Sequence, residues 1–146
     1  GETNFMPVIS LIFFGAAALV NFWLSMRCGQ VRTSEKISHG DGGNVLLSRR
    51  MRAQLNFAEN TPIIMLLVLA LELAGANSDA LWAISAIYIV GRICHALGMD
   101  PDSSKLRMIG VLATFLITLA LAGWAIYTGY NLMGTMAAPD SMAAAL

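Results

Sequence analysis

Four long apolar stretches constrain this chain more than any other feature. They cover about residues 8–26, 53–76, 80–99 and 106–132, and each is close to the roughly 20 residues that a helix needs to cross a bilayer. The stretches are continuously apolar, without the alternation of polar and apolar residues that a transmembrane β-strand shows, so they predict helices. The sequence therefore predicts an all-α integral membrane protein: a four-helix bundle that forms a single domain over residues 1–146.

The composition agrees with a membrane protein and excludes several other classes. Hydrophobic residues make up 57% of the chain and charged residues 12%, whereas about a quarter of the residues of a soluble domain are charged. The same values exclude a disordered chain, because low hydrophobicity is the mark of disorder. Nine basic residues balance nine acidic ones, so nothing indicates a nucleic-acid partner. Two cysteines cannot form a disulfide framework.

The first apolar stretch is expected to be a membrane span that is retained. It is too long for a signal peptide and lacks the basic residues that begin one, and Pro7 is suited to the first turn of a helix. Met6 and Pro7 resemble a natural start, so Gly1–Phe5 is expected to be a remnant of expression or the product of processing.

The basic residues predict how the bundle is oriented in the membrane. They lie in or beside the segment that joins the first two stretches, residues 27–52, and the segment that joins the last two: Arg27, Arg32, Lys36, Arg49, Arg50 and Arg52 in the first, and Arg92, Lys105 and Arg107 around the second. By the positive-inside rule, both segments face the cytoplasm and both termini face away from it. Short loops and the lack of eukaryotic sorting signals favour a bacterial inner membrane. Cys28 and Cys94 then lie near the reducing side and are expected to be free thiols.

A stripe of polar residues enters the second stretch. Arg52, Asn56 and Glu59 are spaced i, i+4 and i+7, which places them on one face of a helix, and Arg49 extends the stripe by one turn. A charge at mid-membrane costs about 2.5–3.5 kcal/mol on insertion scales, so such residues usually face a bundle interior or a wet cavity. Two interpretations follow: a buried arginine–glutamate pair that fixes the helix register, or a site for a polar ligand.

The third stretch carries a second polar face. Tyr88, Arg92 and His95 follow one another at i, i+4 and i+7. An arginine this far inside a span needs a counter-charge, and Glu59 is the expected partner of Arg92. Arg107 opens the fourth stretch at the cytoplasmic edge. No cluster of His, Cys and Asp residues has the spacing of a metal site, so no metal is predicted.

Together these residues predict an anion site. Four arginines are expected to reach one membrane depth with four other polar residues: Arg49, Arg52, Arg92 and Arg107, with Asn56, Glu59, Tyr88 and His95. The arginines outnumber the one carboxylate among them. Because surplus cations attract anions, the sequence predicts a site for a small, polar, mainly anionic molecule at the cytoplasmic edge of the bundle.

The residues from Arg52 to Pro62 resemble the signature of a known family. The MAPEG family (membrane-associated proteins in eicosanoid and glutathione metabolism) has Arg-Ala followed by an asparagine, a glutamate and a nearby proline. This chain has Arg-Ala-Gln-Leu-Asn-Phe-Ala-Glu-Asn-Thr-Pro. The resemblance covers essentially the whole chain, with Gly-Asp-Gly-Gly-Asn at 40–44 in the first loop, residues 91–98 on the third span, and Lys105, Leu106, Arg107 and Gly110 at the start of the fourth. The chain is similar to bacterial-type members related to microsomal glutathione transferase.

The resemblance implies a homotrimer that binds glutathione, in a bent conformation, where its subunits meet. In relatives, the residues matched by Arg52, Asn56 and Glu59 contact glutathione. The residue matched by Gln54 reaches the glutathione of the neighbouring subunit, and Arg27 matches an arginine of the first helix. The residues expected to bind glutathione are Arg27, Arg49, Arg52, Gln54, Asn56, Glu59, Tyr88, Arg92 and His95.

Arg107 is the expected catalytic residue. It matches the arginine that stabilises the glutathione thiolate in the leukotriene-forming members. A free thiol has a pKa of about 8.5, and only its thiolate is a good nucleophile. A guanidinium beside the sulfur, away from bulk water, favours the thiolate. Glu59 is expected to receive the amino group of glutathione, while Arg52 and its neighbours bind the two carboxylates.

The chain departs from the family pattern on the third helix. Members with strong conjugating activity carry tyrosines there, whereas this chain has His95 and Met99, with Tyr88 deeper, and Asn60 stands where some relatives have tyrosine. Two functions therefore stay open. One is a glutathione transferase or peroxidase that acts on lipophilic electrophiles or lipid hydroperoxides. The alternative is a non-catalytic lipid-binding or accessory membrane subunit, which would form no glutathione thiolate.

Overall fold

A computed structural model of the chain describes residues 5–100 and 104–137. This part consists of four helices and contains no strand: α1 Val8–Glu35, α2 Val45–Leu73, α3 Ser78–Met99 and α4 Ser104–Ala137. Each helix contains an apolar segment long enough to span a membrane. The structure thus confirms the predicted all-α, four-span architecture.

The first connection is much shorter than the loop predicted over residues 27–52. Helix α1 continues to Glu35 and α2 already begins at Val45, so only residues 36–44 join them. Gly40, Gly42 and Gly43 all have positive φ angles, which glycine adopts without steric cost. The Asn44 side chain accepts a hydrogen bond from the Leu47 N–H at 2.9 Å and so caps α2.

A small core explains why α1 and α2 extend beyond their apolar stretches. Cys28 and Val31 on α1 are buried against Leu47 on α2, with Ile37 and Met51 packed around them. These apolar positions recur at helical spacing among polar residues. Hydropathy therefore identified the apolar segments of membrane length but not the polar turns that end α1 and begin α2.

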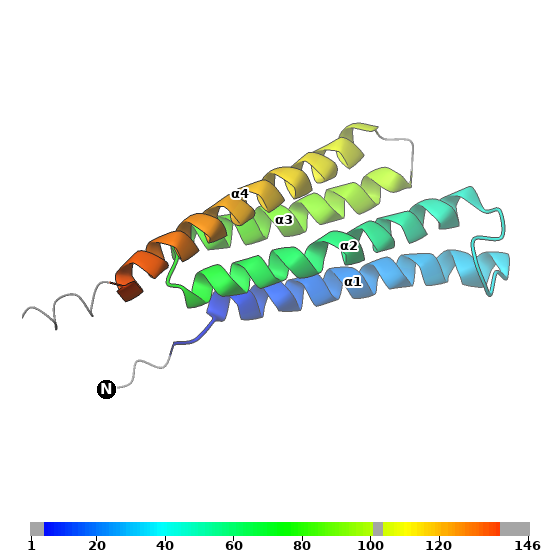
Figure 1. Cartoon of the computed structure of the whole chain (residues 1–146). Coiled ribbons are helices and arrows are strands. Elements are labelled where there is room, and N and C mark those ends of the chain that lie inside the picture. Colours follow the sequence, from blue (N-terminus) through cyan, green and yellow to red (C-terminus); the bar gives the residue numbers. More distant parts are fainter. Residues whose placement is uncertain (1–4, 101–103, 138–146) are drawn as a thin grey trace, which may run out of the picture.

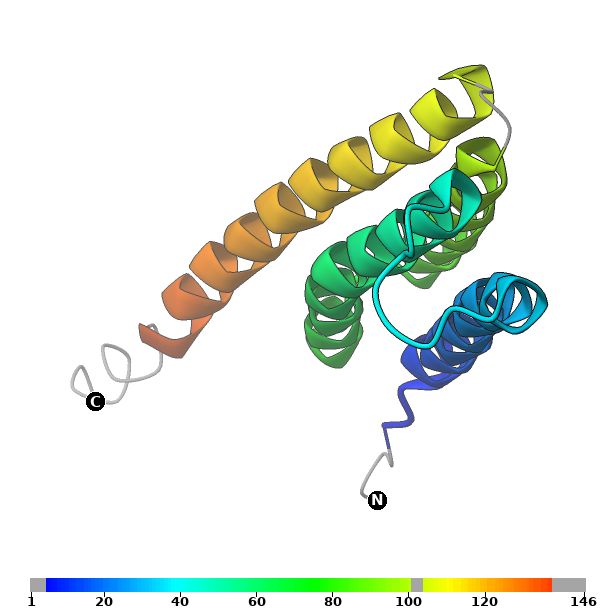
Figure 2. The same cartoon turned by 90° about the vertical axis from the view of Figure 1, so that its right-hand side faces the viewer.

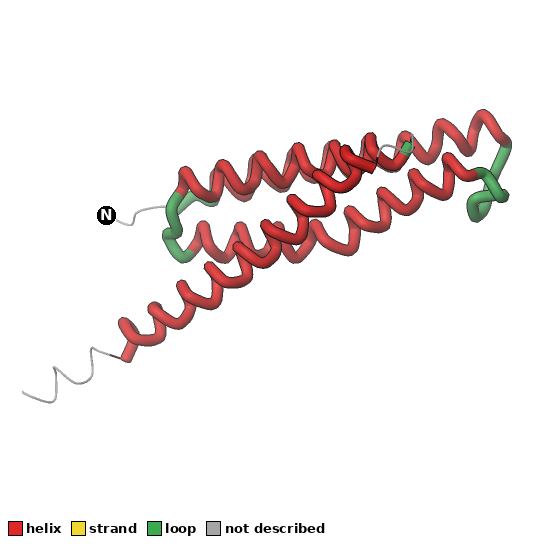
Figure 3. The backbone as a smooth tube through the Cα atoms, turned by 90° about the horizontal axis from the view of Figure 1, so that it is seen from above, coloured by secondary structure: helices red, strands yellow, loops and turns green. Residues whose placement is uncertain are grey.

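The four helices do not form a symmetric bundle. Helix α1 lies beside α2, and α3 lies beside α4 (Figure 1). Figure 2 shows α2 and α3 in the middle, with α1 and α4 on opposite sides, and the described parts of α1 and α4 do not contact each other. Seen from above, α4 crosses the other helices obliquely (Figure 3). The 36–44 connection and the start of α4 lie at the same end, which we call the loop end.

The opposite end is held by an acidic residue that sequence analysis did not single out. Glu72, near the end of α2, accepts hydrogen bonds from the backbone N–H groups of Ile9 and Ser10, each at 2.8 Å, and from the Ser10 hydroxyl. The carboxylate thereby satisfies N–H groups that the first turn of α1 cannot pair internally. Glu72 is thus a second carboxylate within the predicted second span, and its role is structural.

Candidate functional site

A buried arginine joins three helices near the loop end. Arg92 on α3 is only 2% exposed. Its guanidinium donates to Thr114 Oγ1 on α4 at 2.8 Å and to Asn56 Oδ1 on α2 at 2.6 Å, and it lies 3.4 Å from His95 Nδ1. Thr114 in turn donates to the Gly110 carbonyl at 2.9 Å. The remaining nitrogen, Nε, has no hydrogen-bond partner in the described part of the chain.

The expected ion pair between Glu59 and Arg92 is not formed. The partners of Arg92 are neutral groups, and the Glu59 side chain is exposed. Asn56 and Thr114 accept hydrogen bonds from the two terminal nitrogens of the guanidinium. Arg92 is thus bound without a carboxylate, and Glu59, three residues after Asn56, stays exposed.

Close packing of α3 against α4 places Arg107 next to this network. A side chain at Gly98 would overlap the backbone of Arg107, and one at Gly110 would overlap His95. A Cβ at Gly91 would lie 2.9 Å from that of Ala113. These three glycines therefore allow the two helix backbones to meet. Residues 91–98 and Gly110, which resemble the family pattern, thus form part of the contact between α3 and α4.

His95 lies 3.4 Å from the Arg92 guanidinium and within electrostatic reach of two further arginines. The positive charges of Arg92, Arg107 and Arg52 all act on its buried imidazole ring. Arg52 and Arg107 are exposed, whereas Arg92 is buried. The structure thus brings together residues of α2, α3 and α4 that the sequence predicted to share one depth. We call Arg52, Arg92 and Arg107 the cationic cluster.

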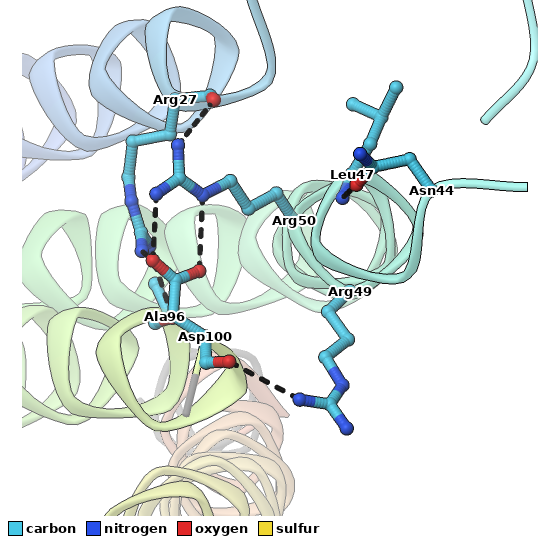
Figure 4. Close-up of polar contacts among 7 residues, drawn as sticks. All are labelled: Arg27, Asn44, Leu47, Arg49, Arg50, Ala96 and Asp100. Atoms are coloured by element: carbon cyan, nitrogen blue, oxygen red, sulfur yellow. Dashed lines mark hydrogen bonds and ion pairs between the residues drawn. The ribbon is translucent and has the colours of Figure 1, made fainter. Parts of the chain in front are cut away.

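A second group of arginines is bound by Asp100, directly after α3 (Figure 4). Arg50 donates to both carboxylate oxygens, at 3.1 and 2.8 Å, and to the Arg27 carbonyl at 2.8 Å. Arg27 also forms an ion pair with Asp100 and donates to the Ala96 carbonyl at 3.0 Å. Arg49 donates to the Asp100 carbonyl at 3.2 Å. Asp100 thus ties α1 and α2 to the end of α3.

These contacts change the electrostatics of Asp100. Burial alone would raise the pKa of its carboxyl group, but the hydrogen bonds from Arg50 and the charges of Arg27 and Arg50 outweigh burial, so the pKa is lowered. Sequence analysis placed Arg27 and Arg49 in the ligand site and did not single out Asp100. Its position directly after the third span, facing two basic segments, is the signal that identifies it.

Two further predicted site residues have local partners. Gln54 donates to Ser25 Oγ at 2.8 Å and accepts from the Cys28 thiol at 3.6 Å, so it bridges α2 to α1. Tyr88 is fully buried, and its hydroxyl lies 2.9 Å from Thr61 Oγ1. It therefore joins α3 to α2 one helical turn before Arg92, whose charge acts on it.

A groove between α1 and α2 opens beside Arg52. Its volume is about 570 Å³, and it is lined by Arg32, Ser48, Met51, Arg52, Gln54, Leu55 and Ala58. Arg32 is held at one side by the Gly40 carbonyl, at 2.7 Å. The groove therefore offers positive charge at Arg32 and Arg52 and an apolar wall at Leu55 and Ala58, a combination that suits an amphipathic anion.

Comparisons with known proteins agree with this architecture. The model of the MAPEG family matches residues 10–127. The chain is also similar to inner membrane protein YecN of Escherichia coli strain K12, with 25% identity over 114 residues, which cover 78% of this chain and 87% of that protein. YecN of Escherichia coli O6:H1 strain CFT073 matches equally. This chain, an integral membrane protein with four spans, belongs to the MAPEG family.

Proposed function

We propose that this protein binds glutathione at the cationic cluster and uses its thiolate on lipophilic electrophiles or lipid hydroperoxides. The supporting observation is the division of the arginines into two groups. Arg27 and Arg50 share the Asp100 carboxylate as an ion-pair partner, whereas no ion pair with a carboxylate is formed by Arg52, Arg92 or Arg107 in the described part of the chain, where Arg92 bonds to Asn56 and Thr114. An anionic ligand would compensate this concentration of positive charge.

The exposed members of the cluster suit the polar ends of glutathione, which carries two carboxylates and one ammonium group. Arg52 is exposed at the edge of the 570 Å³ groove, where a guanidinium can bind a carboxylate through two parallel hydrogen bonds. Glu59 is exposed two turns further along α2 and has no ion pair in the described part of the chain. We assign it to the ammonium group.

Arg107 is the residue we assign to the sulfur. It lies in the first turn of α4, is exposed, and its backbone packs on Gly98 beside the network of Arg92. A guanidinium at the sulfur lowers the thiol pKa and so raises the fraction of thiolate at neutral pH. In conjugation the sulfur bonds to the electrophilic carbon and displaces the leaving group. With a lipid hydroperoxide the thiolate attacks the outer oxygen and the O–O bond breaks. The sulfur becomes a sulfenic acid, and the lipid leaves as an alkoxide that takes a proton from water to give the alcohol. The thiol of a second glutathione then displaces water from the sulfenic acid and forms glutathione disulfide.

The subunit arrangement is part of the proposal. A second groove between α1 and α2, of about 300 Å³, is lined by small and apolar residues that include Ala17, Ala18 and Ala58. Small residues permit close contact between membrane helices. We propose that a neighbouring copy packs along α1 and α2 in a homotrimer and completes the glutathione site.

The test is to titrate glutathione onto the purified protein and follow the absorbance of the thiolate at neutral pH. We expect the thiolate band in the wild-type protein and in Lys105→Ala, which removes an exposed cation from the same turn of α4. Arg107→Ala should abolish the band. A wild-type protein that forms no thiolate would favour the non-catalytic alternative. A band that persists in Arg107→Ala would contradict the role of this residue.

A further inference from the structure

The contacts of Arg92 fix two side chains that can each act either as a hydrogen-bond donor or as an acceptor. A guanidinium group only donates, so the atom that it contacts must accept. The Asn56 amide accepts through Oδ1 at 2.6 Å, and Nδ1 of the His95 ring lies 3.4 Å from the same nitrogen of Arg92. A proton on this Nδ1 would set two N–H groups against each other. Arg92 therefore holds both side chains in their acceptor orientation.

The other polar atom of each side chain is then a donor. With Oδ1 facing Arg92, the Asn56 amide turns the hydrogens of Nδ2 away from it, and with Nδ1 as the acceptor, the neutral His95 ring carries its proton on Nε2. Thr114 offers no such group, because its hydroxyl accepts from Arg92 and donates to the Gly110 carbonyl. The network thus leaves two N–H donors, one from α2 and one from α3.

These two N–H donors are not sealed inside the bundle. Neither forms a hydrogen bond in the described part of the chain, and neither is among the fully covered, unpaired side-chain atoms there, which are Ser85 Oγ and Arg92 Nε. Asn56 is half-buried, and the exposed Arg52 lies one turn before it on α2. An anion bound beside Arg52 can therefore meet N–H donors as well as a guanidinium group.

Arg92 itself is too covered to make such a contact. Its side chain is 2% exposed, its terminal nitrogens are bound to Thr114, Asn56 and His95, and its Nε is fully covered. We propose that Arg92 is a positioning residue, which holds Asn56 and His95 as N–H donors to the anionic groups of the ligand and does not touch the ligand. The identity of this ligand as glutathione rests on the proposed function.

The position of the proton on His95 is the first test, and it needs no ligand. Nitrogen NMR on the whole chain in detergent micelles, with isotope-labelled histidine, distinguishes the two neutral tautomers. The chain has two histidines, and His39→Gln in the exposed 36–44 connection identifies the signal of His95. We expect the proton on Nε2 in the wild-type protein and in Arg92→Lys, which still donates, and a mixture of tautomers in Arg92→Met, which cannot. A proton on Nδ1 in the wild-type protein, or a single tautomer that persists in Arg92→Met, would overturn the role of Arg92.

A matched pair of substitutions at His95 separates ligand binding from structure. The amide oxygen of asparagine can take the place of Nδ1, whereas the terminal amide nitrogen of glutamine can take the place of Nε2. His95→Asn should therefore keep the contact with Arg92 but bind reduced glutathione about tenfold or more weakly, the value of a hydrogen bond to a charged group. His95→Gln should keep the donor and stay within about threefold of the wild-type affinity.

Isothermal titration calorimetry measures both affinities, and thermal unfolding shows whether each variant is folded. Equal affinities of folded His95→Asn and His95→Gln would overturn the use of His95 as a donor. A wild-type protein that binds no glutathione would overturn the proposed function together with this use of the donors. The tautomer, measured without ligand, would still decide whether Arg92 orients His95.

Discussion

At the scale of single residues, the arginines near the loop end differ in what compensates their charge. Arg107 is exposed at the start of α4, whereas Arg27 and Arg50 are held by Asp100. If Arg107 holds the thiolate, Arg107→Ala should leave glutathione affinity within several-fold, because other arginines bind the carboxylates. Its kcat/KM with a model electrophile should fall about 10²-fold, or about 2.7 kcal/mol in transition-state stabilisation. Lys105→Ala should keep wild-type kinetics, and an unchanged kcat/KM in Arg107→Ala would remove this residue from the mechanism.

Because Glu59 and Arg92 form no ion pair, replacing Glu59 should not cost the stability that is lost when a buried ion pair is broken. Because Arg92 is bound by Asn56 and Thr114, Glu59→Gln should leave the free energy of unfolding unchanged within about 0.5 kcal/mol, as for most surface substitutions. It should nevertheless weaken glutathione binding, since the ammonium group loses its carboxylate. Thermal unfolding and glutathione titration on the same preparation separate the two effects. A large loss of stability would show that Glu59 has a structural partner.

Asp100 should make stability depend on pH. Its pKa is lowered in the folded protein, so the ionised carboxylate stabilises the fold above the ordinary aspartate pKa. This stabilisation is lost as the pH falls through the lowered, folded-state pKa. Asp100→Asn should cost about 1–3 kcal/mol at neutral pH, between the values for exposed and buried ion pairs, and should flatten the acid limb of a plot of unfolding temperature against pH. Asp79→Asn, at the exposed start of α3, is the control that should retain this limb.

At the scale of the elements, the contact between α3 and α4 depends on glycine. Gly110→Ala places a methyl group on His95 and should push α4 away from α3, which breaks the hydrogen bond from Arg92 to Thr114. Such overpacking typically costs about 1–3 kcal/mol. Gly123→Ala, on the same helix but with open space around it, should leave the unfolding free energy unchanged or slightly raised. Equal effects of the two substitutions on thermal unfolding would contradict this view of the α3–α4 contact.

At the scale of the whole molecule, the open arrangement of the helices leaves apolar surface for a partner. Helices α1 and α4 lie on opposite sides (Figure 2), and the α1–α2 groove of about 300 Å³ is open. We expect native mass spectrometry from mild detergent to give three times the mass of the 15.6 kDa chain. Replacing Ala18 by Leu should shift the distribution toward smaller species, because it fills a close contact between helices. A purely monomeric wild-type protein would contradict the trimer.

The sequence by itself determined the number and type of elements. In a bilayer every backbone N–H and C=O group must be paired within the segment, so apolar stretches of membrane length must be helices. Helical periodicity also placed Arg52 and Asn56 on one face of α2, the face from which Asn56 bonds to Arg92 of α3. Helix type and the residues that share a helix face are local properties, so the spacing of residues along one segment predicts them.

Only the tertiary structure decided which charges meet. Arg92 bonds to Asn56 and Thr114 rather than to Glu59, and Asp100 binds Arg27 and Arg50 from two other helices. Glu72 reaches the start of α1, 62 residues earlier in the chain. These pairs depend on how each helix is rotated about its axis and how far it slides against its neighbours. The packing of one helix face against another sets this rotation and this shift. The spacing of residues within a single helix does not determine either.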